Sequence, residues 1–90
     1  FDDIDAHDRM KFTIASYNIG YGHIRDAQMI AENEGLDKNK WESMAEVLPL
    51  LRYRKYYKKT RYGYARGTEP VRYVRRIMSY YEILRRQAIN

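Results

Sequence analysis

Residues 15–23 have the sequence ASYNIGYGH, and this stretch decides how the first half of the chain folds. It ends an apolar helical run and then places two glycines on either side of a tyrosine. Glycine readily adopts the backbone angles of a tight turn. We therefore expect one helix over about residues 5–19, a break, and a second helix over about residues 23–34. Spacing predicts an apolar face on the first helix at Met10, Ile14 and Tyr17, and on the second at Ile24, Ala27, Ile30 and Ala31.

The second half of the chain predicts two more helices with an irregular segment between them. A short helix is expected over about residues 41–48, with Trp41 in the core, because Pro49 interferes with continuation. Residues 52–67, RYRKYYKKTRYGYARG, follow neither a helical nor a strand period and are expected to run across a surface. The last helix is expected over about residues 69–87. Its predicted apolar stripe is Val71, Val74, Ile77, Met78, Tyr81 and Leu84. The predicted fold class is all-α.

Length and composition indicate one small domain with an uneven charge. The chain has 90 residues and no cysteine, so neither a disulfide nor a thiolate metal site supports its core. Residues 1–50 carry a net charge of −5 and residues 51–90 a net charge of +10, which indicates an anionic partner or attraction between the halves. Ten tyrosines offer apolar faces with hydrogen-bonding tips, which suit sugar-binding and nucleic-acid-binding surfaces alike. With only His7 and His23 besides, no metal site is expected.

Three motifs follow one another in the part of the chain between about residues 8 and 84. They are Ala15-Ser16-Tyr17-Asn18-Ile19-Gly20, then Tyr62-Gly63-Tyr64-Ala65-Arg66-Gly67, then Glu69-Pro70-Val71-Arg72-Tyr73-Val74. Together they resemble the later half of the lysozyme-like (goose-type, SLT) catalytic domain of lytic transglycosylases, most closely the branch called membrane-bound lytic murein transglycosylase F. Ser16 stands where many members have alanine, which is a mild departure. The resemblance implies that residues 1–90 are the C-terminal part of a single lysozyme-like transglycosylase domain.

The chemistry that the resemblance implies is non-hydrolytic cleavage of peptidoglycan between N-acetylmuramic acid and N-acetylglucosamine. One glutamic acid protonates the glycosidic oxygen and then acts as base while the muramyl 6-hydroxyl closes a 1,6-anhydro ring, without metal or cofactor. One carboxyl group suffices, in contrast to the usual glycosidase pair. In the family this glutamate precedes the Tyr-Asn motif, and no residue here matches it. Glu42-Ser43 follows that motif in a variable connection, so the catalytic acid is expected upstream and this chain alone is expected to be inactive.

The resemblance also implies six substrate-binding residues: Tyr17, Asn18, Gly20, Tyr64, Glu69 and Tyr73. Tyr17 and Asn18 match residues that line the cleft beside the acid, although such a pair also suits a helix C-cap. Tyr73 matches a tyrosine whose hydroxyl points toward the catalytic carboxylate, although an amphipathic helix packs aromatic residues too. Glu69 opens the last helix, where negative charge is stabilising in any case. Tyr64 either borders the groove or only pins its own loop.

Two other functions stay open from the residues alone. Residues 52–61 hold six Lys/Arg and three Tyr, which suits phosphate contacts and base stacking in a nucleic-acid-binding module. A non-catalytic cell-wall-binding module is the other alternative. No known nucleic-acid-binding signature accompanies the basic run, so glycan strands of peptidoglycan, and not nucleic acid, are the expected partner. The resemblance implies a location in the periplasm or cell envelope, and it allows peripheral association with the outer membrane through parts outside this chain.

Overall fold

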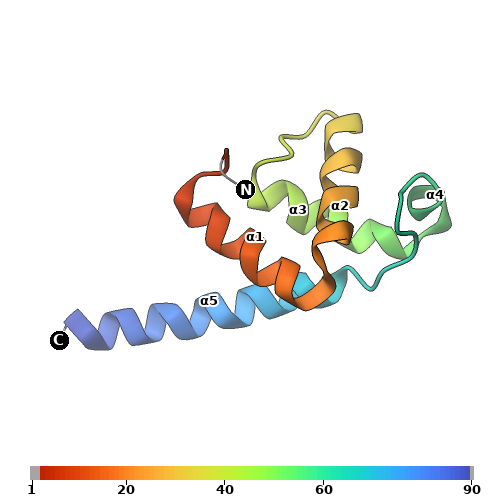
Figure 1. The fold of residues 1–90 in the computed structure, drawn as a ribbon. Coiled ribbons are helices and arrows are strands. Elements are labelled where there is room, and N and C mark those ends of the chain that lie inside the picture. The colour runs from red at the N-terminus through yellow and green to blue at the C-terminus, as the bar shows by residue number, and fades with distance from the viewer. Residues whose placement is uncertain (1–2, 90) are drawn as a thin grey trace.

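The computed structural model describes residues 3–89, and these fold into helices joined by short connections (Figure 1). The elements in chain order are α1 (Ala6–Ile19), α2 (Tyr21–Asn33), α3 (Trp41–Val47), the 3-10 helix η1 (Leu48–Arg52), α4 (Arg54–Tyr57) and α5 (Thr68–Ile89). No strand occurs within residues 3–89. The predicted all-α class is confirmed, and this helical arrangement agrees with a partial lysozyme-like domain.

The corner between α1 and α2 depends on one glycine rather than two. Gly20 has a φ of 101°, and its backbone N–H donates to the Ser16 carbonyl oxygen at 2.8 Å, which closes the last turn of α1. Positive φ at this value favours glycine because a Cβ would be strained there. α2 then begins at Tyr21, two residues before the predicted start, and Gly22 lies inside its first turn.

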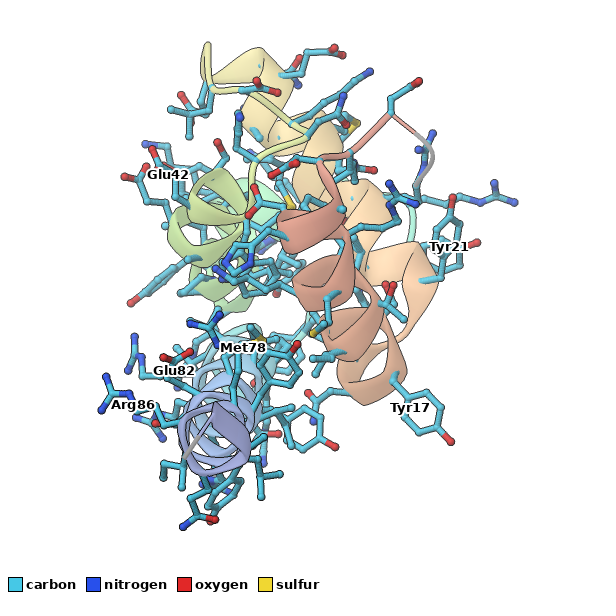
Figure 2. The ribbon with its side chains drawn as sticks, turned by 90° about the vertical axis from the view of Figure 1, so that its left-hand side faces the viewer. Tyr17, Tyr21, Glu42, Met78, Glu82 and Arg86 are labelled. Atoms are coloured by element: carbon cyan, nitrogen blue, oxygen red, sulfur yellow. The ribbon has the colours of Figure 1, made fainter. Side chains whose placement is uncertain are left out.

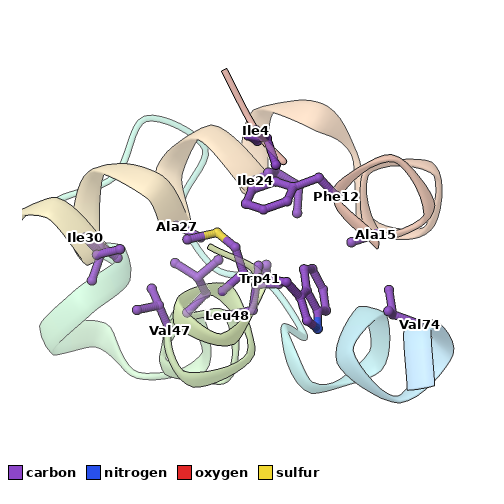
Figure 3. Close-up of a cluster of buried hydrophobic side chains, with 14 residues drawn as sticks. Ile4, Phe12, Ala15, Ile24, Ala27, Ile30, Trp41, Val47, Leu48 and Val74 are labelled. Atoms are coloured by element: carbon purple, nitrogen blue, oxygen red, sulfur yellow. The ribbon is translucent and has the colours of Figure 1, made fainter. Parts of the chain in front are cut away.

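The core lies between α1, α2, α3 and η1 (Figure 3). Its largest fully buried side chains include Phe12, Ile24, Met44, Leu48 and Leu51. The predicted inward face of α2 and the core position of Trp41 are confirmed.

The apolar face that spacing predicts on α1 is not the face that is most deeply buried. Phe12 and Ala15 are the buried residues of α1, whereas Tyr17 is 91% exposed and Met10 is 40% exposed. Met10, Ile14 and Tyr17 follow a helical period, but only Ile14 packs against the core, and Ile14 and Tyr17 line a hollow shared with α5.

The segment between η1 and α5 is less irregular than predicted, because it contains the short helix α4. Its later part is fastened to the body by backbone contacts. The Ala65 N–H donates to the Leu51 carbonyl oxygen at 3.2 Å. Gly67 is buried against the Leu48 carbonyl group, where a Cβ would collide with backbone atoms.

The last helix, α5, crosses α1 with its first half and projects from the body with its second half (Figure 1). Pro70 and Val74 are buried, and Val71 and Met78 are partly buried. Tyr81 and Leu84, the end of the predicted stripe, are exposed, so the stripe is covered only over its first half.

Glu82, on the projecting half of α5, pairs with two arginines of the same helix, and Figure 2 labels Glu82 and Arg86. Glu82 lies 3.4 Å from Arg85 and 3.5 Å from Arg86. The Arg85 hydrogen bond and charge lower the pKa of the Glu82 carboxyl group. Pairs three and four residues apart on one helix face support an exposed helix weakly.

Replacing Gly67 by alanine tests the fastening of the segment before α5. We expect Gly67→Ala to lower the free energy of unfolding by about 3 kcal/mol, because the added Cβ meets the Leu48 backbone and forces η1 and α5 apart. Urea denaturation followed by circular dichroism measures this change. Ser79→Ala, an exposed site on α5, is the control and should stay within about 0.5 kcal/mol. A Gly67→Ala variant as stable as that control would contradict the close packing.

Candidate functional site

The first and third motifs meet at a hollow between α1 and α5. This hollow of about 190 Å³ is lined by Thr13, Ile14 and Tyr17 of α1 and by Tyr73 and Ile77 of α5. Tyr17 and Tyr73 are 56 residues apart in the sequence and contribute to the same wall of the molecule. The Tyr-Asn end of α1 therefore lies next to the first half of α5.

The α1 side of the hollow is set by the way α1 ends. Phe12 and Ala15 are fully buried, and this fixes the rotation of α1 so that Tyr17 points away from the core (Figure 2). The Ser16 hydroxyl donates a hydrogen bond to the Phe12 carbonyl oxygen at 2.8 Å, so its proton is used within the helix. Asn18 is exposed beside Tyr17, and nothing lies within 4 Å of a Cβ built on Gly20. The helix end therefore presents a phenol, an amide and bare backbone to solvent.

The α5 side of the hollow is set by the packing of Val74. Val74 is 2% exposed in the core, so its neighbour Tyr73 is turned toward the side of α5 that faces α1. Ile77, one turn later, lines the same hollow. The residues of the described chain that line it include no Asp, Glu or His. The hollow thus offers apolar surface and two phenol groups, which can donate hydrogen bonds to a carboxylate or a sugar.

Two of the predicted substrate-binding residues do not line the hollow. Tyr64 is 52% exposed, and its ring meets the Tyr57 ring edge-on with centroids 5.9 Å apart. Glu69 is exposed in the first turn of α5, with a carboxylate oxygen 3.8 Å from the Arg66 guanidinium. The structure therefore brings Tyr17 and Tyr73 together, with Asn18 and Gly20 next to Tyr17 along the chain, while Tyr64 and Glu69 do not line the hollow.

Glu42, which the sequence analysis rejected as the catalytic acid, does not line the hollow. Glu42 is exposed in the first turn of α3, and Figure 2 shows it pointing away from Tyr17. His23 lies in the first turn of α2, with its ring 6.1 Å from the Tyr62 ring. Within residues 3–89, no group of three or more His, Cys, Asp or Glu side chains is placed to hold a metal ion.

Sequence reasoning missed a buried carboxylate that fastens the second motif. Asp26 is 5% exposed, and its two carboxylate oxygens accept hydrogen bonds from the backbone N–H groups of Arg61 at 3.1 Å and Tyr62 at 3.0 Å. These partners are 35 and 36 residues away, so no local pattern indicates them. The one available signal was a carboxylate in the middle of an otherwise well-packed helix.

No helix among the described residues is both long enough and apolar enough to cross a membrane.

Comparison with known proteins gives relatives of one name. The chain is 62% identical over 88 residues to the membrane-bound lytic murein transglycosylase F of Desulfosudis oleivorans (strain DSM 6200 / JCM 39069 / Hxd3), covering 97% of this chain and 19% of that protein. The proteins of that name from Shewanella woodyi (strain ATCC 51908 / MS32) and Pseudomonas syringae pv. tomato (strain ATCC BAA-871 / DC3000) are 58% and 55% identical, each over 92% of this chain and 17% of the protein. No family model matches the chain.

These identities confirm the resemblance drawn from the three motifs. The chain is homologous to one segment of proteins named membrane-bound lytic murein transglycosylase F, and it spans only 17–19% of their length.

Proposed function

We propose that this chain forms part of a peptidoglycan lytic transglycosylase and supplies one wall of its glycan-binding cleft. The observation that carries the proposal is the meeting of Tyr17 and Tyr73 at one hollow, because the two motifs that imply a cleft come from distant parts of the sequence. The name of the relatives, lytic murein transglycosylase, supports the same activity.

The catalytic acid of such an enzyme comes from outside this chain. In the implied reaction a glutamic acid gives its proton to the glycosidic oxygen as the C1–O bond breaks. The muramyl 6-hydroxyl oxygen then bonds to C1, and its proton goes to the same carboxylate. The Tyr73 hydroxyl, at the hollow, is suited to donate a hydrogen bond to that carboxylate and so to influence its pKa. Asn18 and the Gly20 backbone are suited to hold the sugar beside it.

The uncovered side of α5 supports placement of this chain within a larger lysozyme-like domain, as its C-terminal part. Tyr73, Ile77, Tyr80 and Leu84 follow one another at spacings of four, three and four residues, which is the spacing of a helix-packing seam. Tyr80 is 59% exposed and Leu84 is 64% exposed. A projecting helix end with such a seam gains most of its stability from packing. We propose that the rest of the domain, including the segment with the acid, covers this seam.

The location that fits this activity is the cell envelope. The relatives' name includes the words membrane-bound, and peptidoglycan lies in the periplasm of bacteria with an outer membrane. We place the complete protein there, with peripheral attachment to the outer membrane through parts outside residues 1–90.

The first test compares this chain with the complete protein. Purified sacculi are digested with each, and soluble products are analysed by mass spectrometry for 1,6-anhydromuramyl ends. We expect such ends from the complete protein and none from the 90-residue chain, because no residue of the chain matches the acid. Products with ordinary reducing ends from the complete protein would show hydrolysis and contradict the proposal.

Substitutions at the hollow separate catalysis from wall binding. In the complete protein we expect Tyr73→Phe and Asn18→Ala each to lower turnover of a defined glycan by about 10- to 100-fold while leaving sedimentation with sacculi near normal. The reason is that only interactions that are stronger in the transition state raise the rate. Tyr53→Phe, at an exposed tyrosine that does not line the hollow, is the matched control and should leave turnover unchanged. Unchanged turnover in Tyr73→Phe would remove that residue from the site.

The basic surface around α4 is expected to attract the anionic cell wall without taking part in the reaction. Arg54, Lys55, Lys58 and Lys59 are all exposed. Changing these four residues together to glutamine in the complete protein should weaken sedimentation with sacculi at low salt, and the effect should fade near 0.15 M salt, where charges are screened over about 8 Å. Turnover of a short neutral glycan should stay within about twofold. Loss of that turnover would show that these residues belong to the cleft.

A further inference from the structure

We propose that Asp26 is a positioning residue whose buried carboxylate holds the segment Thr60–Tyr64 in place, so that the half-exposed rings of Tyr62 and Tyr64 form a fixed contact surface for the glycan. The inference rests on the proposed function and assigns a role to a buried carboxylate that the hollow does not use. We call this pair of rings the tyrosine edge.

The bond between Asp26 and the segment is bidentate and shielded from water. One carboxylate oxygen accepts the Arg61 N–H at 3.1 Å and the other accepts the Tyr62 N–H at 3.0 Å, while Asp26 itself is 5% exposed. Bonds from N–H groups to an ionised carboxylate are roughly twice as strong as neutral ones. Because both contacts are to backbone, they fix the course of the main chain whatever side chains it carries.

The Tyr62 ring is seated directly on the first turn of α2. A Cβ added at Gly22 would lie 2.6 Å from Tyr62 Cε2, so the ring occupies the space that a side chain would need. The His23 ring meets the Tyr62 ring edge-on at 6.1 Å, and the Arg61 guanidinium carbon lies 5.4 Å from the Tyr62 ring centroid. Tyr62 is nevertheless 53% exposed, so part of the ring stays open to solvent.

The next residues of the segment are held by a second set of contacts. The Thr60 hydroxyl accepts the Gly63 N–H at 3.0 Å and donates to the Tyr57 carbonyl oxygen at 2.7 Å, which closes a tight loop around the tip of the segment. The Tyr64 ring then packs edge-on against Tyr57, with an interplanar angle of 89°.

The tyrosine edge is therefore a pair of half-exposed aromatic rings on a backbone that is fixed from inside. A fixed tyrosine offers a large contact area at little cost in conformational entropy, and a preorganised surface binds more tightly than a mobile one. Gly22 lies two residues after Gly20, so the Tyr62 ring is next to the α1–α2 corner that presents Tyr17 and Asn18. The edge can extend the proposed glycan-binding surface from this corner toward α4.

The test uses the 90-residue chain and a hexamer of β-1,4-linked N-acetylglucosamine as the probe. Asp26→Asn keeps the size of the side chain but leaves only one acceptor oxygen for two N–H groups. We expect hydrogen exchange of the Arg61 and Tyr62 amides to rise by about tenfold or more, since one charge-assisted bond is lost. The ring-current shift of the Gly22 Hα protons, which lie against the Tyr62 ring, should diminish. Hexamer-induced NMR shifts at Tyr62 and Tyr64 should require a several-fold higher hexamer concentration.

Asp8→Asn is the matched control. Like Asp26, Asp8 accepts a hydrogen bond from the backbone N–H of a residue distant in the sequence, which is Trp41 at 3.0 Å. Trp41 does not belong to the segment Thr60–Tyr64, so this bond does not hold the tyrosine edge. We expect Asp8→Asn to lower stability while leaving the Gly22 shift and the hexamer titration unchanged. If both variants weaken hexamer binding equally, Asp26 acts only through overall stability and the proposal is overturned.

Gly22→Ala provides a second route to the same end in case Asp26→Asn fails to fold. The added methyl group displaces the Tyr62 ring while the bonds to Asp26 remain, so hexamer binding should weaken again. Normal hexamer binding by Gly22→Ala, or the absence of hexamer-induced shifts at Tyr62 and Tyr64 in the unmodified chain, would overturn the role of the tyrosine edge. The proposed function fails on a different result, which is the lack of 1,6-anhydro products from the complete protein.

Discussion

The packing of α5 across α1 is the contact on which the candidate site depends. Ala15 of α1 and Val74 of α5 are both buried in one core cluster, on facing helices (Figure 3). Burial of Ala15 turns Tyr17 outward, and burial of Val74 turns Tyr73 toward α1. The hollow with its two phenol groups follows from these two small core residues. A large side chain at either position would separate the helices and with them the two motifs.

Two carboxylates, of Asp8 and Asp26, connect segments that are distant in the sequence, as disulfides do in other small domains. Asp8 holds the start of α3 through the Trp41 N–H, and Asp26 holds the segment before α5 through Arg61 and Tyr62. Both connect residues more than 30 positions apart with backbone contacts. In a chain of 90 residues without cysteine, such long-range anchors determine where the irregular segments run.

Exposed apolar and aromatic side chains gather on two parts of the molecule, to which we assign different proposed roles. The seam of Tyr73, Ile77, Tyr80 and Leu84 continues from the hollow along the projecting half of α5, and it is suited to packing against further helices of a larger domain. The tyrosine edge lies next to the first turn of α2, where the Tyr62 ring contacts Gly22, and its backbone is held by Asp26. Tyr17 and Asn18, at the end of α1, are the residues that we propose to lie beside the glycan strand and the catalytic acid.

The sequence by itself determined the helices α1, α2, α3 and α5, the corner at Gly20 and the inward face of α2. These features depend on residues within a few positions of one another. Through the resemblance to a known family, the sequence also predicted that Tyr17 and Tyr73 both lie near the same catalytic carboxylate. Only the tertiary structure decided which face of α1 is buried, since Phe12 and the Met10–Tyr17 face are both apolar and the choice depends on what packs against them. It alone decided that Gly22 lies under the Tyr62 ring and that Asp26 holds Arg61 and Tyr62. Those contacts join residues 35 to 40 positions apart, and a local period carries no information about partners at that distance.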